Sequence, residues 1–323
     1  ISTSGNSKAI DEENRVIIEA DKFIYNKLKN IVDAEGNVVI EDQINNYKIF
    51  SNQASYNKNQ EKISTSGNSK AIDEENRVII ANKFFYLKSK NIFQAKENAQ
   101  IEDLNENFII ESENISYFKN DAKIITKGIT KAFIESKYNI KSKDVTYLID
   151  EKKLSSKKYS TVEDNNYQVY KLDEFLFLTD EKILKGKNIV SITNYNLPKS
   201  DKFYFTEGIF NLENKNFISK DKKIKINKNI FDNKDNDPRI YGISSQGNEN
   251  LTTIKKGVFT SCQIREGCAP WSITSEEIEH NKEKKQISYK HATLNIYDIP
   301  ILYFPKFFHP DPSVNRQSGF LKP

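Results

Sequence analysis

Residues 1–18 read ISTSGNSKAIDEENRVII, and residues 63–80 repeat this stretch without a single change. The copy belongs to a longer and more diffuse repeat, whose spacing alternates between 31 and 30 residues. Glu97 takes the place of one missing glycine in a series that otherwise runs Gly5, Gly36, Gly67 and Gly128. Tyrosines keep step at Tyr25, Tyr56, Tyr86, Tyr117 and Tyr147. A fixed period of this size indicates a stacked repeat, in which each unit covers the apolar face of its neighbour.

Apolar and polar residues alternate within each unit, which predicts β-strands. Seven residues before each repeat tyrosine lies an isoleucine, which gives the column Ile18, Ile49, Ile79, Ile110 and Ile140. Two residues earlier lies the column Val16, Tyr47, Arg77, Phe108 and Tyr138. Arg77 is the one charged residue in this otherwise apolar column. The identical copies would instead align Val16 with Val78 and Ile18 with Ile80. The third unit could therefore adopt either of two registers that differ by one residue, with Ile79 or Ile80 in the buried column.

The phase of the apolar pattern changes inside each unit. Small residues follow the isoleucines at Ala20, Ser51, Ala81, Ser112 and Ser142. The next apolar column comes three residues later, at Phe23, Ala54, Phe84, Ile115 and Val145. A slip of one residue in a period of two turns the buried face outward unless the strand bends. We therefore predict an all-β stack of short strands, each bent or bulged at the small residue.

Composition excludes several classes of protein. Lys and Arg number 49 against 45 Asp and Glu, and the charges are interspersed. This pattern is typical of a solvated surface, so we expect no nucleic-acid partner. No apolar run reaches the length of a membrane-spanning helix. The sequence contains no methionine, and we expect it to be a fragment or a processed product.

The sequence shows no catalytic or cofactor chemistry. His280, His291 and His309 lack metal-ligand spacing, so we interpret them as structural. Glu276 and Glu277 lie in a polar stretch and do not suggest a general acid–base pair. We found no nucleophile motif and no phosphate-binding loop. We therefore expect no enzyme, no cofactor and no metal.

The two cysteines, Cys262 and Cys268, lie six residues apart with Gly267 between them. This spacing allows a small disulfide-closed loop, and the alternative is two free thiols. We predict the disulfide because the interpretation below places this region outside the cytoplasm.

The last 24 residues, PILYFPKFFHPDPSVNRQSGFLKP, resemble the outer-membrane lipopolysaccharide-assembly family LptD, also called OstA. The specific residues are Pro310, Asp311, Pro312, Ser313 and Gly319. The run from Gly257 through Cys262 and Cys268 to Ile273 resembles the same family. The rungs of residues 1–155 resemble the repeats that this family shares with the periplasmic bridge protein LptA.

The resemblance implies a β-jellyroll, or β-taco, whose apolar groove passes lipopolysaccharide acyl chains from a periplasmic bridge to an outer-membrane barrel. Residues 1–155 would be regular repeats, 156–299 a less regular continuation, and 300–323 a connector to the barrel. The expected location is the outer membrane, with this region periplasmic. The expected partners are lipopolysaccharide, an LptA-like bridge at an open N-terminal strand edge around residues 1–18, and an LptE-like lipoprotein through the barrel. The resemblance implies that the family's interdomain disulfides use cysteines in regions outside this sequence. Cys262 and Cys268 would then pair with each other or with a cysteine outside this sequence.

The resemblance also makes the apolar columns candidate groove residues: Val16, Ile18, Phe23, Tyr25, Ile49, Tyr56, Ile79, Phe84, Tyr86, Phe108, Ile110, Ile115, Tyr117, Ile140 and Tyr147. The alternative is that they pack against one another in a structural or adhesive β-solenoid, or that the chain is itself an LptA-like bridge component. A solenoid enzyme would need clustered Asp, Arg or Lys on one face, whereas these columns hold mostly apolar and hydroxyl residues. Lysines beside the rungs, such as Lys8, Lys70, Lys127 and Lys131, could meet lipid phosphates, but we expect them to form a solvated rim. Lys58 is likewise expected to be exposed.

Overall fold

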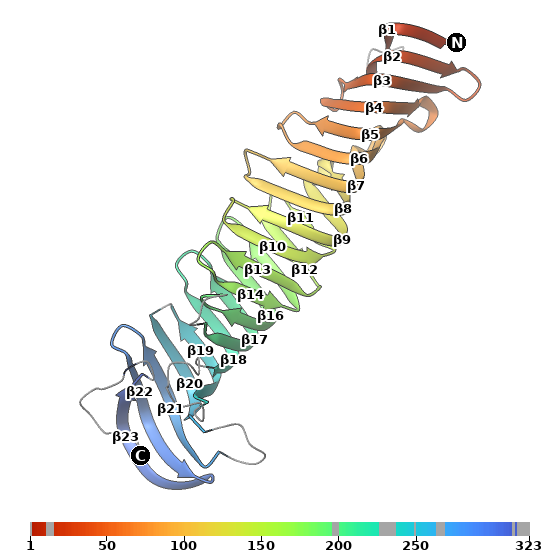
Figure 1. The fold of residues 1–323 in the computed structure, drawn as a ribbon. Helices are drawn as coiled ribbons and strands as arrows, with labels where there is room; N and C mark the ends of the chain where they lie inside the picture. Colours follow the sequence, from red (N-terminus) through yellow and green to blue (C-terminus); the bar gives the residue numbers. More distant parts are fainter. Residues whose placement is uncertain are drawn as a thin grey trace. The chain divides into compact units, whose positions relative to one another are not determined.

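The computed structural model describes residues 2–10, 16–195, 200–225, 237–248, 250–262, 269–311 and 314. They form antiparallel strands joined by tight turns and divide into two compact units, residues 1–158 and 159–323. Within each unit the strands follow one another essentially in chain order (Figure 1). The prediction of an all-β stack is confirmed.

Unit 1 consists of strands joined by short turns, three of which are single 3-10 turns: η1 (Lys58–Gln60), η2 (Lys88–Lys90) and η3 (Lys119–Asp121). Its described strands are β1 (Ser2–Ile10), β2 (Val16–Asn26), β3 (Ile31–Asp42), β4 (Tyr47–Asn57), β5 (Lys62–Ile72), β6 (Val78–Leu87), β7 (Ile92–Asp103), β8 (Phe108–Phe118), β9 (Lys123–Ile134), β10 (Tyr138–Lys143), β11 (Thr146–Leu148) and β12 (Lys153–Ser156). Each of β1 to β8 pairs with the next strand, and β9 pairs with both β10 and β11.

The strands bend where the sequence predicts it. The pairing register shifts next to the small residue between Glu19 and Lys22 in β2, Phe50 and Gln53 in β4, Ile80 and Lys83 in β6, and Ser112 and Asn114 in β8. In the fifth unit the strand is interrupted after the small residue, since β10 ends at Lys143 and β11 begins at Thr146. Each bulge turns one half-strand against the other, so unit 1 has two walls with an interior between them.

The glycine series has its reason in these bulges. Gly36 and Gly67 lie at the register shifts of β3 and β5 with φ near +79°, a conformation that glycine adopts without a Cβ penalty. Glu97 holds the same place in β7 with φ of 62°. Glycine recurs because the returning strand needs a left-handed residue at its bend.

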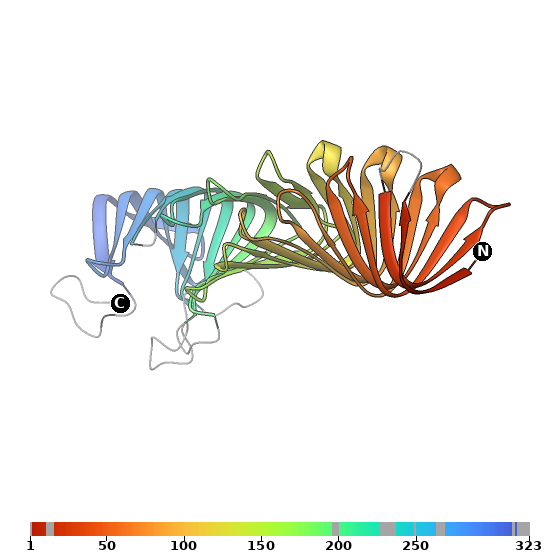
Figure 2. The ribbon, with the colours of Figure 1, turned by 90° about the horizontal axis from the view of Figure 1, so that it is seen from above.

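The strand ends of unit 1 form two rows of turns. One row, which we call the aspartate rim, contains Asp42, Asp73 and Asp103, whose Oδ1 atoms accept backbone N–H groups of the following turn. The other row, the lysine rim, contains η1, η2 and η3, which lie in line along one side of unit 1 (Figure 2). The two rims border the mouth of the interior.

Unit 2 is a second antiparallel stack. Its described strands are β13 (Ser160–Asp164), β14 (Val169–Leu172), β15 (Glu174–Leu178), β16 (Ile183–Ile192), β17 (Lys202–Asn211), β18 (Phe217–Lys225), β19 (Arg239–Gly247), β20 (Leu251–Thr260), β21 (Trp271–Asn281), β22 (Gln286–Ile296) and β23 (Ile299–Pro310). A buried cluster around Ile254, Phe259 and Tyr289 fills its last rungs.

The proline-containing run after Ile299, expected as the connector, includes strand β23, which pairs with β22 and lies at the edge among the described strands. Prolines are tolerated there because an edge strand has a free side. At the N-terminal end, the strand edge expected around residues 1–18 falls on β1 among the described strands, because Val16 and Ile18 lie in β2, which β1 and β3 flank. No helix among the described residues is long and apolar enough to cross a bilayer.

Candidate functional site

The isoleucine column is buried and continuous in unit 1. Ile18 lies opposite Ile40, which lies opposite Ile49 on the next strand. Ile79 lies opposite Ile101, and the ladder continues to Ile110 and, through Ala132, to Ile140. All five isoleucines are at most 3% exposed. The structure also settles the open register, because Ile79 is buried whereas Ile80 is 41% exposed.

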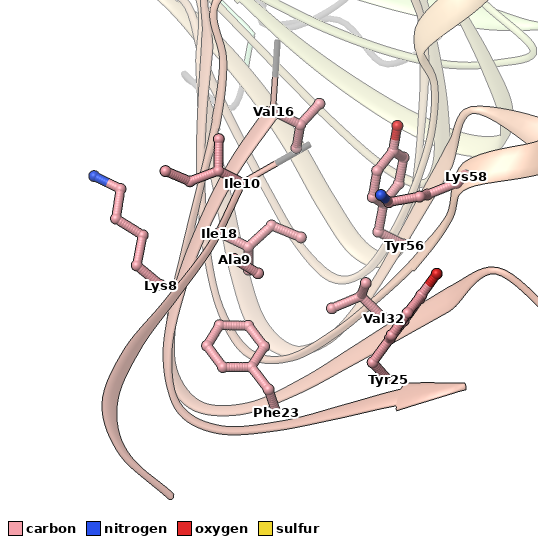
Figure 3. A pocket seen from close by; sticks show the side chains of 10 residues that line it. All are labelled: Lys8, Ala9, Ile10, Val16, Ile18, Phe23, Tyr25, Val32, Tyr56 and Lys58. Atoms are coloured by element: carbon pink, nitrogen blue, oxygen red, sulfur yellow. The ribbon is translucent and has the colours of Figure 1, made fainter. Parts of the chain in front are cut away.

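A cavity of about 270 Å³ opens between the two walls at the first rungs. Its wall is mostly apolar, and both walls contribute to the lining: Lys8, Ala9, Ile10, Val16, Ile18, Phe23, Tyr25, Val32, Tyr56 and Lys58. Figure 3 shows Ile18 and Phe23 on one wall facing Tyr56 on the other. The cavity thus brings together five of the predicted groove residues.

The other ten predicted groove residues fill the interior of the later rungs. Phe93 stacks on Tyr86 with ring centroids 4.2 Å apart and contacts Tyr47 at 4.4 Å. Phe108 packs edge-on against Tyr147 at 5.1 Å. These contacts are those of a packed core, in contrast to the open space of the cavity at the first rungs. All ten are at most 2% exposed, namely Ile49, Ile79, Phe84, Tyr86, Phe108, Ile110, Ile115, Tyr117, Ile140 and Tyr147.

Lys58 corrects the expectation that the rung lysines are simply solvated. It begins η1 and is half-buried in the lining of the cavity, on the same wall as Tyr56 (Figure 3). Lys8, also on the cavity edge, points away from it and pairs with Glu19 at 3.3 Å.

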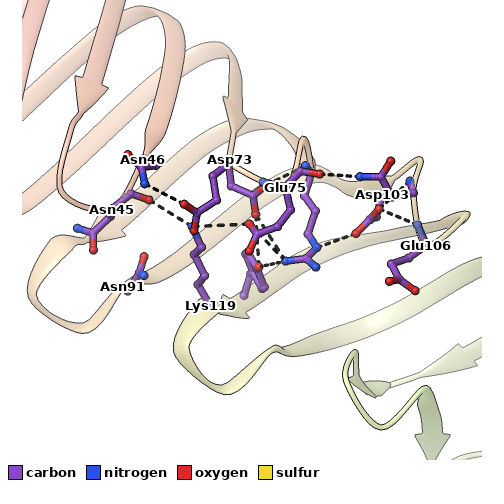
Figure 4. A network of polar contacts seen from close by, with 12 residues as sticks. Asn45, Asn46, Asp73, Glu75, Asn91, Asp103, Glu106 and Lys119 are labelled. Carbon is purple, nitrogen blue, oxygen red and sulfur yellow. Dashed lines mark hydrogen bonds and ion pairs between the residues drawn. The ribbon is translucent and has the colours of Figure 1, made fainter.

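Beyond the cavity, polar contacts bridge the two rims (Figure 4). Lys119 Nζ lies 2.8 Å from Glu74 Oε1 and donates to the Asn45 carbonyl at 3.2 Å. The Tyr117 hydroxyl accepts from Arg77 Nη1 at 2.8 Å and donates to Asp73 Oδ2 at 3.4 Å. Lys119 and Tyr117 on one side of the mouth therefore contact the Glu74 and Asp73 carboxylates on the other side. These contacts close the mouth at this rung.

The same bridge recurs one rung on either side. The Tyr86 hydroxyl donates to Asp42 Oδ2 at 2.9 Å, and Lys88 Nζ lies 3.7 Å from Asp42 Oδ1. Lys152 pairs with Glu106 on the following rung. The partners are 44 to 46 residues apart in each case, which is one and a half repeats. The closure is thus a property of the repeat.

Burial sets the protonation of this network. It raises the pKa of Asp73 to about 6, although the N–H of Arg77 partly offsets the effect. Burial also raises the pKa of the Tyr86 and Tyr117 hydroxyls, which keeps them neutral donors. The hydrogen bond from Lys119 lowers the pKa of Glu74. The aspartate column was not recognised from the sequence, although Asp11, Asp42, Asp73 and Asp103 follow the repeat spacing.

The predicted connector residues lie at the end of unit 2. Pro310 ends β23, and Asp311 is buried, donates its N–H to the Lys285 carbonyl at 2.8 Å and pairs with His280. His280 thus anchors the chain after β23, a role that its position in the sequence did not indicate. Pro312, Ser313 and Gly319 lie outside the described residues.

The disulfide stays a prediction. Cys262 is half-buried with its Sγ 3.8 Å from the Trp271 carbonyl, and Cys268 lies outside the described residues. Among the residues that the structure does describe, no three His, Cys, Asp or Glu side chains gather as metal ligands.

Sequence comparison finds relatives named LPS-assembly protein LptD. The protein from Hahella chejuensis is 37% identical over 79 residues, which is 24% of this chain and 10% of that protein. The proteins from Nitrosomonas eutropha and Yersinia pestis are 37% and 35% identical over 75 and 72 residues. The matched part therefore spans about a tenth of the length of these relatives. The resemblance to LPS-assembly proteins is confirmed over about a quarter of the chain.

Two further comparisons complete this result. No protein-family model matches the chain. Among solved structures, LptH, the LptA-homologous periplasmic component of the lipopolysaccharide transport device of Pseudomonas aeruginosa, aligns with a TM-score of 0.30 and 17% identity. This alignment covers 34% of the present chain and 80% of LptH.

Proposed function

We propose that this chain acts in lipopolysaccharide transport and assembly at the outer membrane, and that unit 1 holds acyl chains between its two walls. The observation that carries the proposal is the apolar cavity at the start of a repeat whose buried columns continue from rung to rung. The LptD relatives support it. On this proposal the described region lies in the periplasm, and its role is transport without catalysis.

The cavity has the chemistry that an acyl chain needs. Such a chain binds through continuous apolar surface, worth about 25 cal/mol for each Å² removed from water. It needs no directional partner, and Ile18, Phe23 and Val32 supply the apolar contact. The cavity is slightly smaller than the roughly 300 Å³ at the lower end of typical ligand pockets, which suits part of one chain. A repeat offers the same surface again one rung further on.

Passage beyond the cavity requires the mouth to open. The saccharide of a lipopolysaccharide is too polar to enter an apolar interior, because burying its hydroxyl groups without partners is costly. It must stay outside while the acyl chains lie inside, so the bridges at Asp42 and Glu74 have to separate as it passes. We propose that the ten packed groove residues contact lipid only in this opened state.

The partner at the N-terminal end would be an LptA-like bridge protein. Among the described strands, β1 pairs only with β2 and so presents a free edge, which is a template for a further strand. Proline is placed at Lys8 and at Ala9 in separate variants, because the N–H groups of neighbouring residues point to opposite sides of the strand. The proline that removes the outward-pointing N–H should weaken binding of the LptA-like partner. Unchanged binding in both variants would exclude this edge. An LptE-like lipoprotein partner rests on the resemblance alone.

The packed core of the later rungs favours a second candidate function, a structural β-solenoid that binds no lipid. A photo-crosslinking residue separates the two. Placed at Ile18, inside the cavity, it should capture lipopolysaccharide in cells, whereas at the adjacent exposed Glu19 it should not. Equal capture at both positions, or none at either, would favour the structural role.

A further inference from the structure

The lysine rim carries one lysine at the same place in successive rungs. Lys58, Lys88 and Lys119 each begin a 3-10 turn. The backbone N–H of each donates to the carbonyl at the end of the preceding turn of that rim, at 3.0, 3.0 and 3.2 Å. One rung is two strands, so successive lysines are about 10 Å apart. Their sequence positions therefore predict equivalent surroundings.

Their partners nevertheless differ. Lys88 and Lys119 face carboxylates across the mouth, at Asp42 and Glu74. Lys58 stands instead over the cavity, and the part of the chain that the structure describes supplies no ion pair to its ammonium group. Figure 3 shows Lys58 on the same wall of the cavity as Tyr56, across from Ile18. Of these three lysines, Lys58 is the one without an ion pair to a described residue, and it lies beside the cavity.

We propose that Lys58 binds the anionic headgroup of an amphiphile whose alkyl chain occupies the cavity. This inference rests on the proposed function, since it assumes that a chain fills the apolar space. An ammonium group at the boundary between an apolar cavity and water attracts an anion while the chain is removed from water. The charge selects an anionic headgroup, and the cavity selects for a chain. The bridged lysines of the next rungs bind such a headgroup only after Asp42 or Glu74 releases them.

The test uses the whole chain and two amphiphiles with the same alkyl chain, dodecyl phosphate and dodecyl maltoside, below their micelle-forming concentrations. Calorimetry measures the affinity of each for the unaltered protein, for Lys58→Gln and for Lys22→Gln. Lys22 is the matched control, because it lies on the outer face next to Phe23 and the same charge is lost. Inorganic phosphate alone serves as the anion without a chain.

Dodecyl phosphate should bind the unaltered protein and Lys22→Gln equally. Lys58→Gln should weaken it about two- to fivefold, the range of a partly exposed ion pair. Dodecyl maltoside should bind all three proteins alike, and inorganic phosphate should not bind detectably. The loss should shrink as ionic strength rises. An unchanged affinity of Lys58→Gln for dodecyl phosphate would overturn the proposal, as would binding of inorganic phosphate as tight as that of dodecyl phosphate.

Phe23→Ala distinguishes this failure from a failure of the proposed function. If both amphiphiles bind and Phe23→Ala weakens both, the cavity holds the chain whatever Lys58 does. If neither amphiphile binds the unaltered protein, the lipid-binding role fails and the headgroup site fails with it. Circular dichroism should confirm that each variant is folded.

Discussion

Ile18 and Ile80 hold the same position in two identical eighteen-residue segments, yet they face opposite sides of the sheet. Ile18 is 3% exposed in the interior, whereas Ile80 is 41% exposed on the outer face. Ala9 lies opposite Ile18 in the first hairpin, but its copy Ala71 lies opposite Ile79 in the second. The same sequence thus adopts two hairpin registers that differ by one residue.

The cause lies at the bulge that follows. Ala20 and Ala81 are both buried next to a register shift, but Ile18 lies two residues before Ala20, whereas Ile80 lies directly before Ala81. Side chains alternate between faces along a strand. Counting back from the bulge therefore places Ile79 inside and Ile80 outside.

This register predicts unequal costs for two adjacent substitutions. Ile79→Ala should lower the free energy of unfolding by about 2–5 kcal/mol, because it leaves a cavity in a packed core. Ile80→Ala should change it by less than about 1 kcal/mol. Urea denaturation monitored by circular dichroism measures both, and a larger effect at Ile80 would refute the register.

The cavity predicts a difference between two equivalent phenylalanines. Phe84 is 1% exposed and packs edge-on against Phe93, whereas Phe23 borders the cavity. Phe84→Ala should cost about 3–5 kcal/mol. Phe23→Ala should cost clearly less, since one side of its ring loses no packing partner. Equal losses in urea denaturation would mean that the cavity is filled.

Arg77 occupies the column position that Val16 holds in the first unit, and it does so through its ion pairs. Its Nε lies 2.7 Å from Asp103 Oδ2, and its Nη1 lies 3.8 Å from Asp73 Oδ2. Arg77→Leu should destabilise unit 1 by about 3–5 kcal/mol, because it removes the cation that pairs with the buried carboxylates of Asp73 and Asp103. Adding Asp103→Asn should restore part of the loss. A stable Arg77→Leu variant would show that the pairs matter little.

Asp73 predicts a pH dependence with a definite sign. Its folded-state pKa of about 6 lies above its ordinary value of 3.8, so the folded protein binds the proton more tightly. The resulting stabilisation is complete below pH 3.8 and is lost as the pH rises through 6. At about 1.4 kcal/mol per pKa unit, this is on the order of 3 kcal/mol.

The Asp73→Asn variant tests this sign. Other carboxyl groups titrate in the same range, so the measured quantity is the difference in unfolding free energy between the variant and the unaltered protein. The stability of the variant relative to the unaltered protein should increase between pH 4 and 7. A difference that is constant with pH would mean that Asp73 does not titrate there.

Glu97 predicts a stabilising substitution. It holds a left-handed conformation with φ of 62° at a bulge where the repeat otherwise has glycine. Glu97→Gly should raise the free energy of unfolding by about 0.5–1 kcal/mol, even though it removes an exposed pair with Lys83. Gln94→Gly, in the same strand, is the control and should destabilise. Destabilisation by Glu97→Gly would show that the ion pair outweighs the strain.

The sequence by itself determined the stack, the bend and the burial of the isoleucine column. These features depend on a period of two and on one phase slip per repeat, which are local and recur five times. The tertiary structure settled which isoleucine of the third unit is inside, because the identical segments favour Ile80 whereas the spacing to the bulge and to Tyr86 favours Ile79.

The tertiary structure alone also decided whether the interior is packed or empty. Lys88 and Lys119 are equivalent in sequence, and which carboxylates their charges meet depends on segments one and a half repeats away. Whether Phe23 borders empty space while Phe84 meets Phe93 depends on side chains from the opposite wall. A period in the sequence fixes which residues point inward, but packing between distant strands fixes whether the space between them is filled.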